Sequence, residues 1–532
     1  MRSLPLSSRP YESEIPDASA RLHPMSGNAE SLVPLLAGWH AFEILVVGDF
    51  MLDQAQHGSA DRLSPDAPVP VLLSRGASDL RQTPGGSSHV ALCAAALGGR
   101  VRCFGVTGAD SEAKALRSLL QESGCDSTGL IEDASRPTTV KRSIVGLAQH
   151  RHPQKMFRVD VESNEPIEAS IEARLLKAIE LAAKTCDVIC LEDYAKGVCT
   201  ESLCQRVIAI GCALKKPVLV DPAAISDYAK YKGATCITPN RTEAALAAGR
   251  RLVHDFDHAE MRLLAKSLRE QLKLEAVVLT LDRHGSYLDR TGVEPLHVPT
   301  VARRVYDVTG AGDMVLAALA AALANQFPWP EAVALANVAA GLEVEVFGAQ
   351  AIPFSQVRRQ VLMQAGHMAG KIRDRESLRI ELEARRAAGQ RIVLTNGCFD
   401  VMHAGHVLSL RESRALGDVL VVALNSDHSV QKLKGANRPV FPLEQRMEVM
   451  AALECVDLVT SFDESTAHEI IRQVAPAVYA KGGDYKRAEE VAECALLKEM
   501  GIELRLLGHV PGVSTTAAIH KMRSHETGIV GG

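Results

Sequence analysis

A glycine-rich segment with two carboxylates, Asp307–Asp313 (DVTGAGD), precedes a long apolar run and has residue types suited to phosphate chemistry. Gly310 and Gly312 leave the backbone bare, so successive N–H groups can point at an anion where a helix begins. Asp313 would then lie in the first turn of that helix, beside the positive end of its dipole. A carboxylate there could take a proton from a hydroxyl while amides from Gly310, Ala311 and Gly312 stabilise a phosphoryl group. The alternative is a glycine-rich loop that only caps a buried helix.

A second segment, Thr395–His406 (TNGCFDVMHAGH), carries two histidines three residues apart. With Gly405 between His403 and His406, both imidazoles could face a phosphate at the N-terminus of a helix. From there they could donate hydrogen bonds to the oxygens of a pentavalent transition state. Two alternatives remain open: a metal site, although no third ligand at a suitable spacing is apparent, and histidines that lie in the core. The segment therefore predicts a second site that acts on phosphate.

Polar residues follow several strand candidates in the first part of the chain, and ligands of parallel sheets bind beyond the carboxyl ends of the strands. Asp49 and Asp53 could bind sugar hydroxyls, or could belong to a solvated loop. Asn240 and Glu243 could hold Mg²⁺ through water, since Mg²⁺ prefers few protein ligands, or could form the capping box of a helix. Other residues with suitable charge or a bare backbone in these loops are Gly85, Gly86, Asp193 and Lys196.

The elements that position these residues alternate between strands and helices. The apolar strands expected in the first part of the chain are 43–48, 101–106, 187–191, 217–220, 234–238 and 275–280. The helices expected around them are 86–98, 112–122, 170–184, 200–213, 257–271, 311–325 and 330–345. This order predicts an α/β fold with a doubly wound parallel sheet, covered by helices on both faces. Residues 69–73 and 138–145 break the order and predict a small β lid.

A second, smaller series of strands and helices follows a charged helical segment. Its expected strands are 391–395, 418–424, 455–459, 476–481 and 502–507, with helices near 405–415, 442–451, 465–473 and 489–499. This order predicts a compact Rossmann-like domain with five strands. We therefore expect a flexible extension at residues 1–40, a first α/β domain at 41–353, a helical linker at 354–388 and the second domain at 389–532.

The composition argues against several classes of protein. The chain has 532 residues, of which 47% are hydrophobic and 23% charged, and a formal net charge of -5 gives no sign of nucleic-acid binding. Its 12 cysteines are scattered without a C-x-x-C pair, which favours free thiols in a reducing compartment over disulfides or zinc. The sequence has neither a long apolar run nor a signal-peptide pattern, so we expect a cytoplasmic protein without a membrane segment.

Three motifs that occur in this order, Gly85-Gly86, N-x-x-E at 240–243 and D-x-T-G-A-G-D at 307–313, resemble those of the ribokinase-like (PfkB) sugar kinases. The resemblance covers about residues 43–353 and implies the ribokinase-like fold, with ATP and Mg²⁺ as cofactors but no metal cage built from protein alone. It implies that Asp313 is the base acting on the acceptor hydroxyl. The residues it places near the nucleotide and metal are Asn240, Glu243, Thr280, Gly285 and Asn337.

Charged residues of the first domain could bind the sugar substrate. We expect Lys141, Arg158 and Lys196 to bind a substrate phosphate and Asp53 to bind sugar hydroxyls, although such basic side chains are often only solvated. The family's helix usually reads G-G-x-x-N, whereas this chain has His89 at the last position. An imidazole differs from an amide in shape and hydrogen-bonding capacity, so the identity of the sugar stays open.

The second domain is similar to the HxGH nucleotidyltransferases, which transfer a nucleotidyl group to a phosphate without a covalent intermediate. Lys434, Arg446 and Lys481 could balance triphosphate charge, while Ser514 and Thr515 could cap a helix around a phosphate or form a plain N-cap. The other positions expected to bind the nucleotide are Asn396, Gly397, Phe399, Asn425, Gly483 and Asp484.

The fused pair resembles the bifunctional heptose-phosphate enzymes of ADP-heptose biosynthesis. The resemblance implies phosphorylation of D-glycero-D-manno-heptose 7-phosphate at its anomeric hydroxyl by ATP. It also implies transfer of AMP from ATP to heptose 1-phosphate with release of pyrophosphate, and a homodimer. The expected lid strands at 69–73 and 138–145 could pair with those of another chain. Three alternatives remain: another sugar phosphate, CTP in the second domain, or a binding protein with one inactive site.

Overall fold

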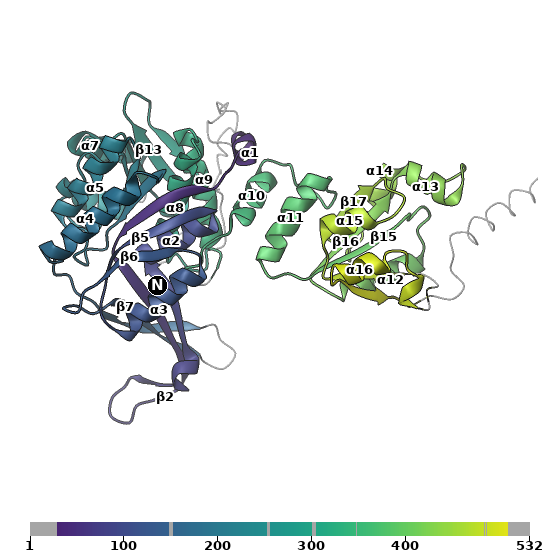
Figure 1. Ribbon diagram of the computed structural model, residues 1–532, viewed down its shortest axis with the longest axis horizontal. Coiled ribbons are helices and arrows are strands. Elements are labelled where there is room, and N and C mark those ends of the chain that lie inside the picture. Colours follow the sequence, from purple (N-terminus) through teal and green to yellow (C-terminus); the bar gives the residue numbers. More distant parts are fainter. Residues whose placement is uncertain are drawn as a thin grey trace, which may run out of the picture.

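The computed structural model describes residues 29–147, 153–252, 256–300, 305–346, 348–482, 485 and 487–508. Two α/β domains follow one another along the chain, and helices α10 (Phe354–Gln364) and α11 (Arg375–Ala387) connect them (Figure 1). Among the described residues, no helix combines the length and the apolar character needed to cross a lipid bilayer.

The first domain is built on a nine-stranded sheet in the order β14-β13-β12-β11-β10-β9-β1-β5-β6. The strands from β12 to β6 pair in parallel, whereas β13 and β14 form an antiparallel edge. Their bounds are β1 (Phe42–Gly48), β5 (Gly99–Thr107), β6 (Asp126–Glu132), β9 (Val188–Glu192), β10 (Val218–Asp221), β11 (Cys236–Ile237), β12 (Ala276–Thr280), β13 (Ser286–Arg290) and β14 (Leu296–Val298). The six strands expected from apolar runs are present. The sheet also contains β6, β13 and β14, which had no clear apolar signal.

Helices cover both faces of this sheet because side chains of one strand alternate between two cores. In β1, Ile44 and Val46 belong to one core and Leu45 and Val47 to the other. The first core is covered by α1 (Ala29–Ala37), α2 (Ser87–Ala96), α3 (Ser111–Glu122), α8 (Ala311–Ala324) and α9 (Trp329–Glu343). The second is covered by α4 (Ala169–Ala183), α5 (Glu201–Leu214), α6 (Arg241–Ala247) and α7 (His258–Leu272). The predicted doubly wound architecture is confirmed.

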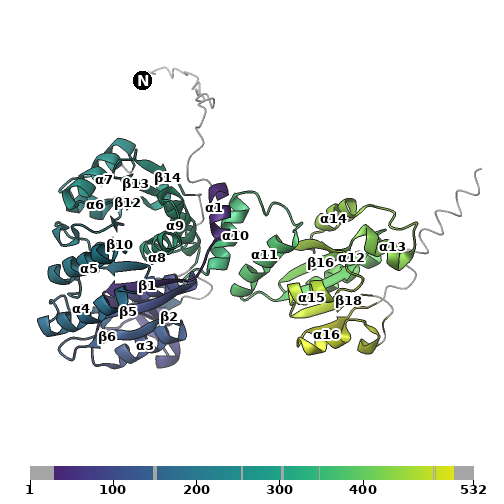
Figure 2. The same cartoon turned by 45° about the horizontal axis from the view of Figure 1, so that its top comes forward.

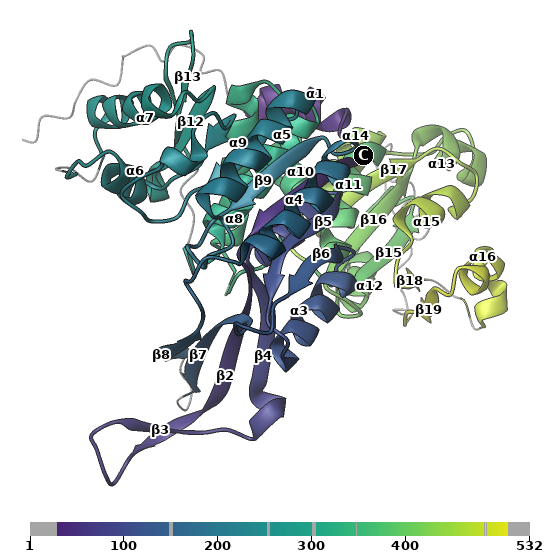
Figure 3. The same cartoon turned by 60° about the vertical axis from the view of Figure 1, so that its left-hand side comes forward.

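A separate lid sheet extends away from the helices of this domain (Figure 3). Its strands run in the order β3-β2-β7-β8, and β4 also pairs with β2. They are β2 (Phe50–Leu63), β3 (Pro70–Leu73), β4 (Leu80–Gly86), β7 (Thr139–Leu147) and β8 (Gln154–Val161). The lid is larger than the two segments predicted. Asp53 and Gly85, expected in loops, lie on paired strands because the chain turns into β2 directly after β1.

The last part of the expected flexible extension at residues 1–40 is ordered in the structure. Residues 29–37 form α1, whose Leu32 and Leu36 are buried in the first core. Helix α1 lies beside α10 (Figure 2), and the following Trp39 stacks on Phe354 with ring centroids 4.6 Å apart. Apolar burial therefore orders this stretch, while residues 1–28 lie outside the described part of the chain.

The second domain has a five-stranded parallel sheet in the order β17-β16-β15-β18-β19. Its strands are β15 (Ile392–Gly397), β16 (Val419–Asn425), β17 (Leu458–Phe462), β18 (Val478–Lys481) and β19 (Glu503–Leu506). Its helices are α12 (Ala404–Arg414), α13 (Asp427–Lys434), α14 (Leu443–Ala451), α15 (His468–Val474) and α16 (Cys494–Glu499). Short 3-10 turns occur at Gly76–Asp79, Ala229–Tyr231, Asp282–His284 and Ala488–Glu490. The predicted Rossmann-like order is confirmed, with β17 starting later than expected.

Candidate active sites

Asp313 lies in the first turn of α8, and its side chain is only 5% exposed. The N-cap of this helix is Gly310, with φ 92°, a left-handed conformation that favours glycine. A Cβ at this position would lie 2.5 Å from Glu343 Oε1 and 2.8 Å from His89 Nε2. Both the conformation and the space therefore require the bare backbone that an anion-binding helix N-terminus needs.

The carboxylate of Asp313 is surrounded by other polar groups. Tyr194 donates its hydroxyl hydrogen to Asp313 Oδ1 at 3.0 Å. Carboxylate oxygens of Glu192, Asp221 and Asp313 lie within 4.8 Å of one another. Burial raises the pKa of Asp313 to about 6, against the opposing effects of His89 and Tyr194. A group with this pKa is ionised at neutral pH and can be protonated during a reaction, as a general base must be.

Glu192, Asp221 and Tyr194 were not predicted as site residues. Burial, followed by the charge of Asp221, raises the pKa of Glu192 well above its usual value. Glu192 is the last residue of β9 and Asp221 the last residue of β10, two adjacent parallel strands. Both residues could have been predicted from the sequence as site residues, since each is a carboxylate at the carboxyl end of a buried strand. Such ends meet at one edge of a parallel sheet, where ligands bind.

His89 does not occupy an open position on the sugar side. It is 1% exposed, and its Nε2 lies 2.7 Å from Oε1 of the fully buried Glu343. Burial opposes the charged form, but Cys93, Glu343 and Asp313 together raise the pKa of His89 well above its ordinary value. The imidazolium is therefore held in an ion pair beside Gly310, and the buried Nδ1 has no hydrogen-bond partner among the described residues.

Two aspartates predicted to bind sugar hold the turn after β9. The backbone N–H groups that donate to Asp49 are those of Tyr194 (2.8 Å), Lys196 (3.0 Å) and Val198 (3.3 Å). Asp193 accepts hydrogen bonds from the hydroxyl of Tyr231 at 2.7 Å and from the backbone of Ala195. It also pairs with Lys230. The oxygens of both carboxylates are thus directed at protein groups and shape this turn, while sugar binding by Asp49 and Asp193 stays a prediction.

One face of the lid sheet carries a row of charged residues. Asp53 lies opposite Lys141, and Lys141 opposite Asp160, in the registers of β2, β7 and β8. Arg158 is bound to Asp160 through two hydrogen bonds of 2.8 Å, and Lys196 donates to Glu162 at 2.7 Å. The carboxylate of Asp53 packs against Gly85, where a Cβ would come within 2.7 Å of it. On this side the lid reaches the helix N-terminus, since Lys155 pairs with Asp307 at 3.2 Å.

On the side where the nucleotide is expected, Asn240 and Glu243 form the capping box of α6. Asn240 Oδ1 accepts the N–H of Thr242 and of Glu243, and Glu243 Oε2 accepts the N–H of Asn240. Thr280 ends β12 and forms a bridge with Asn240. Asn337 is buried and bonded to Ser286 and to the carbonyl of Val298, and Gly285 has φ 86° where a Cβ would lie 2.3 Å from the same carbonyl. These residues lie together at one edge of the large sheet, and most of their polar atoms form hydrogen bonds with other protein groups.

In the second domain, His403 is the N-cap of α12 and His406 lies in its first turn. Their rings stack with centroids 3.8 Å apart, and Phe399 packs edge-on against His406. Burial, together with His403 and Lys434, lowers the pKa of His406 to about 4, so the ring is neutral at pH 7. His406 Nδ1 accepts the backbone N–H of His403 at 3.4 Å, which leaves the proton of the neutral ring on Nε2 as a donor.

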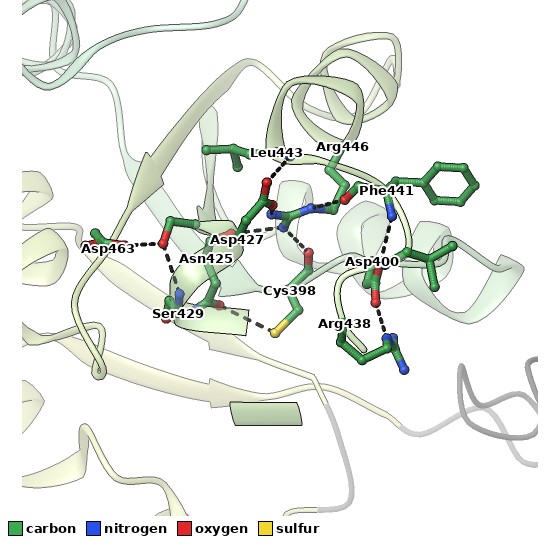
Figure 4. A network of polar contacts seen from close by, with 12 residues as sticks. Cys398, Asp400, Asn425, Asp427, Ser429, Arg438, Phe441, Leu443, Arg446 and Asp463 are labelled. Atoms are coloured by element: carbon green, nitrogen blue, oxygen red, sulfur yellow. Dashed lines mark hydrogen bonds and ion pairs between the residues drawn. The ribbon is translucent and has the colours of Figure 1, made fainter. Parts of the chain in front are cut away.

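Arg446 was predicted to balance triphosphate charge, but the structure directs its guanidinium at protein groups (Figure 4). The side chain is 1% exposed and pairs with Asp427 at 2.6 Å. The carbonyls that accept from it are those of Cys398 (2.6 Å), Asn425 (2.9 Å) and Phe441 (3.0 Å). A buried guanidinium must have partners for its N–H groups, and here those partners tie the HxGH loop to the end of β16 and the start of α14.

We expect Arg446→Gln to destabilise the second domain rather than weaken ATP binding selectively. The change removes a buried charge that binds three carbonyls and Asp427, at a cost of about 3 kcal/mol. Thermal unfolding should show a lower transition for the second domain with the first domain unchanged. An unchanged transition with a raised KM for ATP would instead assign Arg446 to the phosphates.

The other predicted nucleotide residues lie at the ends of β15, β16 and β18. Lys481 donates to Asn396 at 3.0 Å, and Asn396 also accepts from the hydroxyl of Tyr479. Asn425 binds Ser429, while Lys434 is exposed and close enough to lower the pKa of His406. Gly397 ends β15 against the ring of Phe399, whose φ is 43°. Gly483, Asp484, Ser514 and Thr515 lie outside the described residues.

Comparisons with known proteins agree with this two-site geometry. The profile of the pfkB family carbohydrate kinases matches residues 43–356, and that of the cytidylyltransferase-like family matches residues 394–521. The Bifunctional protein HldE of Pseudomonas aeruginosa (strain LESB58) is 43% identical over 480 residues, covering 90% of this chain and 97% of that protein. The chain belongs to the bifunctional HldE family. The HldE protein of Syntrophotalea carbinolica is 41% identical, over 90% of this chain and 95% of its own length.

Family membership confirms the predicted fold class and function. A ribokinase-like kinase domain is joined to a cytidylyltransferase-like domain, as a heptose 7-phosphate kinase and heptose 1-phosphate adenylyltransferase. Among solved structures, ribokinase from Arabidopsis thaliana with ribose and ATP matches 61% of this chain and 99% of its own, at 19% identity and a TM-score of 0.47.

Proposed function

We propose that Asp313 is the general base that accepts the proton of the anomeric hydroxyl of D-glycero-D-manno-heptose 7-phosphate. The sugar oxygen forms a bond to the γ-phosphorus of ATP as the bond to ADP breaks. Amides of Gly310, Ala311 and Gly312 stabilise the charge on the transferred group. The observation that carries this proposal is the buried carboxylate, with a pKa of about 6, in the first turn of a helix whose N-cap must be glycine.

The sugar phosphate binds between this helix and the charged face of the lid. Lys141 and Arg158 attract its 7-phosphate, with Lys196 at the edge, while Asp53 binds hydroxyls over the bare backbone of Gly85 and Gly86. Burial raises the pKa of Asp53, although the nearby charge of Lys141 opposes this shift. Hydroxyl donors from a bound sugar would therefore stabilise the charged form of this carboxylate. One oxygen of Asp53 is buried without a partner among the described residues.

ATP binds along the edge formed by Thr280, Gly285 and Asn337. A Mg²⁺ ion bound with the phosphates would neutralise part of their charge, without a cage made of protein ligands alone. Asn240 and Glu243 already satisfy one another in the capping box, so they fit a water-mediated contact with a hydrated Mg²⁺ better than direct coordination.

In the second site, His403 and His406 donate hydrogen bonds to the phosphates of ATP. A phosphate oxygen of heptose 1-phosphate attacks the α-phosphorus, and pyrophosphate leaves. The neutral His406 ring with its proton on Nε2 supports this role, since a donor is available without a charge that would titrate near pH 7. Lys434 and Lys481 balance charge on the leaving phosphates, beside Asn396 and Phe399.

Purified protein tests both reactions. With ATP, Mg²⁺ and heptose 7-phosphate it should release ADP, and with ATP, Mg²⁺ and heptose 1-phosphate it should release pyrophosphate. Fructose 6-phosphate and CTP are the comparison substrates. Faster turnover of either would assign another sugar phosphate or another nucleotide to the corresponding site.

We also propose a cytoplasmic homodimer that pairs through the outer face of the lid. All twelve cysteines are free thiols, as expected in a reducing compartment. Phe157 and Val159 are 58% and 45% exposed on β8, at the edge of the lid sheet. They alternate with Arg158 and Asp160 and so lie on the face opposite the substrate. An apolar face of this kind on a strand edge fits a second copy of the chain.

We expect Phe157→Glu combined with Val159→Glu to convert the dimer into a monomer without unfolding it. Two carboxylates on this face would lose solvation if they were buried against the partner. Sedimentation velocity measures the change, and Leu181→Glu, another exposed apolar residue on α4, is the control. A double variant that sediments as the wild-type dimer would place the interface elsewhere.

A further inference from the structure

Tyr194 lies between the lid and the base and is fixed from three sides. Its hydroxyl donates to Asp313 Oδ1 at 3.0 Å. The ammonium of Lys141 lies 4.3 Å from the centroid of its ring, within the range of a cation–π interaction. Its backbone N–H donates to Asp49 Oδ2 at 2.8 Å. A side chain held in this way cannot move without disturbing the lid or the turn after β9.

The turn that carries Tyr194 is built to present it. Ala195, the next residue, has φ 55°, a conformation that costs energy for a residue other than glycine. Three N–H groups of the turn converge on the buried carboxylate of Asp49, which offsets this cost. The strained turn directs the phenol at Asp313 while Asp193 points the other way, towards Tyr231.

We propose that Tyr194 is a positioning residue of the kinase, whose hydroxyl fixes Oδ1 of Asp313 so that Oδ2 receives the proton of the sugar hydroxyl. The inference rests on the proposed role of Asp313 as base. With one oxygen bound, rotation of the carboxylate is restricted, and the free oxygen keeps a single orientation towards the acceptor. Tyr194 retains its own proton throughout, because burial and the charge of Asp313 raise the pKa of the phenol well above its ordinary value.

The same hydrogen bond keeps the base ionised among several acids. Glu343 from α9 disfavours a further negative charge on Asp313, whereas the charge of Asp313 itself helps to raise the pKa of Glu192 from β9 and of Asp221 from β10. His89 from α2 and Lys141 from β7 favour the negative charge on Asp313. A hydrogen bond that donates to the carboxylate stabilises the charged form. Without the hydroxyl of Tyr194, the base would be protonated at a higher pH.

Tyr194→Phe removes only the hydroxyl and keeps the ring beneath Lys141. We expect the kinase kcat to fall about tenfold at pH 8 through lost orientation, with little change in the KM for the sugar phosphate. The acid limb of the kcat profile should move upward by about one pH unit, so the loss is larger at pH 6. The adenylyltransferase activity of the same sample should be unchanged. Tyr228→Phe is the matched control, since its buried hydroxyl has no hydrogen-bond partner among the described residues.

An unchanged kcat and acid limb in Tyr194→Phe would overturn the proposal. If this variant is unstable, 3,5-difluorotyrosine at position 194 tests it in the opposite direction, because a more acidic phenol is a stronger donor and should move the acid limb downward. Asp313→Asn distinguishes failure of the role proposed for Tyr194 from failure of the role proposed for Asp313. If the Asp313→Asn kinase is inactive and Tyr194→Phe has the same pH profile of kcat as wild type, only the role of Tyr194 is refuted. If the Asp313→Asn kinase is active, the proposed base is refuted.

Discussion

Asp313→Asn is expected to lower the kcat of the kinase by about 10³-fold, a typical contribution of a positioned general base. Asparagine has nearly the same shape, so it can still accept the hydroxyl of Tyr194 and occupy the first turn of α8. It cannot accept a proton from the sugar. The substitution therefore removes the proton transfer while the fold of the site is kept, and ADP release from heptose 7-phosphate measures the loss.

The second reaction is the internal control for this variant. His403 and His406 lie at the start of α12, in the second domain, whose sheet contains no strand of the first domain. Pyrophosphate release from heptose 1-phosphate should therefore proceed at the wild-type rate. Loss of both activities together would contradict two separate sites, and an unchanged kinase would reduce Asp313 to a cap of a buried helix.

His406→Ala is expected to lower the adenylyltransferase kcat by about 10²- to 10³-fold, the usual effect of removing one donor that binds a transition state. The neutral ring offers Nε2–H to phosphate oxygens, and the methyl group of alanine offers no donor in its place. Because the pKa of His406 is about 4, the wild-type donor should not titrate between pH 6 and pH 8.

Kinase activity should be unchanged in His406→Ala. His468→Ala, in the same domain, is the matched control because its ring contacts Thr466 rather than the stacked pair. A variant with full adenylyltransferase activity would show that the two histidines only shape the loop. A loss that zinc restores would favour the metal alternative.

Local signals in the sequence were sufficient for most of the fold. Continuous apolar runs predict buried parallel strands because both faces of such a sheet are covered. The lid was underestimated, since β2 has alternating burial and polar residues such as Gln54 and Asp61 that resemble a loop. Helix α1 was missed because its short apolar stripe is ordered by packing against distant elements, which no local pattern reveals.

The parts of the candidate sites that lie within a single short motif were predictable from the sequence. The helix starts at Gly310 and His403 are of this kind. Contacts between distant segments were not predictable: His89 meets Glu343, a residue 254 positions away, and Tyr194 reaches Asp313 across the domain. The buried contacts of Arg446 were not predictable for a related reason, since a guanidinium suited to phosphate is equally suited to buried carbonyls, and its phosphate-binding role stays a prediction.

The reaction proposed at Asp313 can be followed most directly by ³¹P NMR of heptose 7-phosphate incubated with ATP, Mg²⁺ and each of three proteins. Wild type and His406→Ala should both produce a second sugar phosphorus resonance, coupled to the anomeric proton, with one ADP per phosphate transferred. In the time that wild type needs to complete the reaction, Asp313→Asn should produce neither this resonance nor ADP. A phosphate on another carbon, or the same resonance from Asp313→Asn at the wild-type rate, would contradict phosphorylation of the anomeric hydroxyl by a base at Asp313.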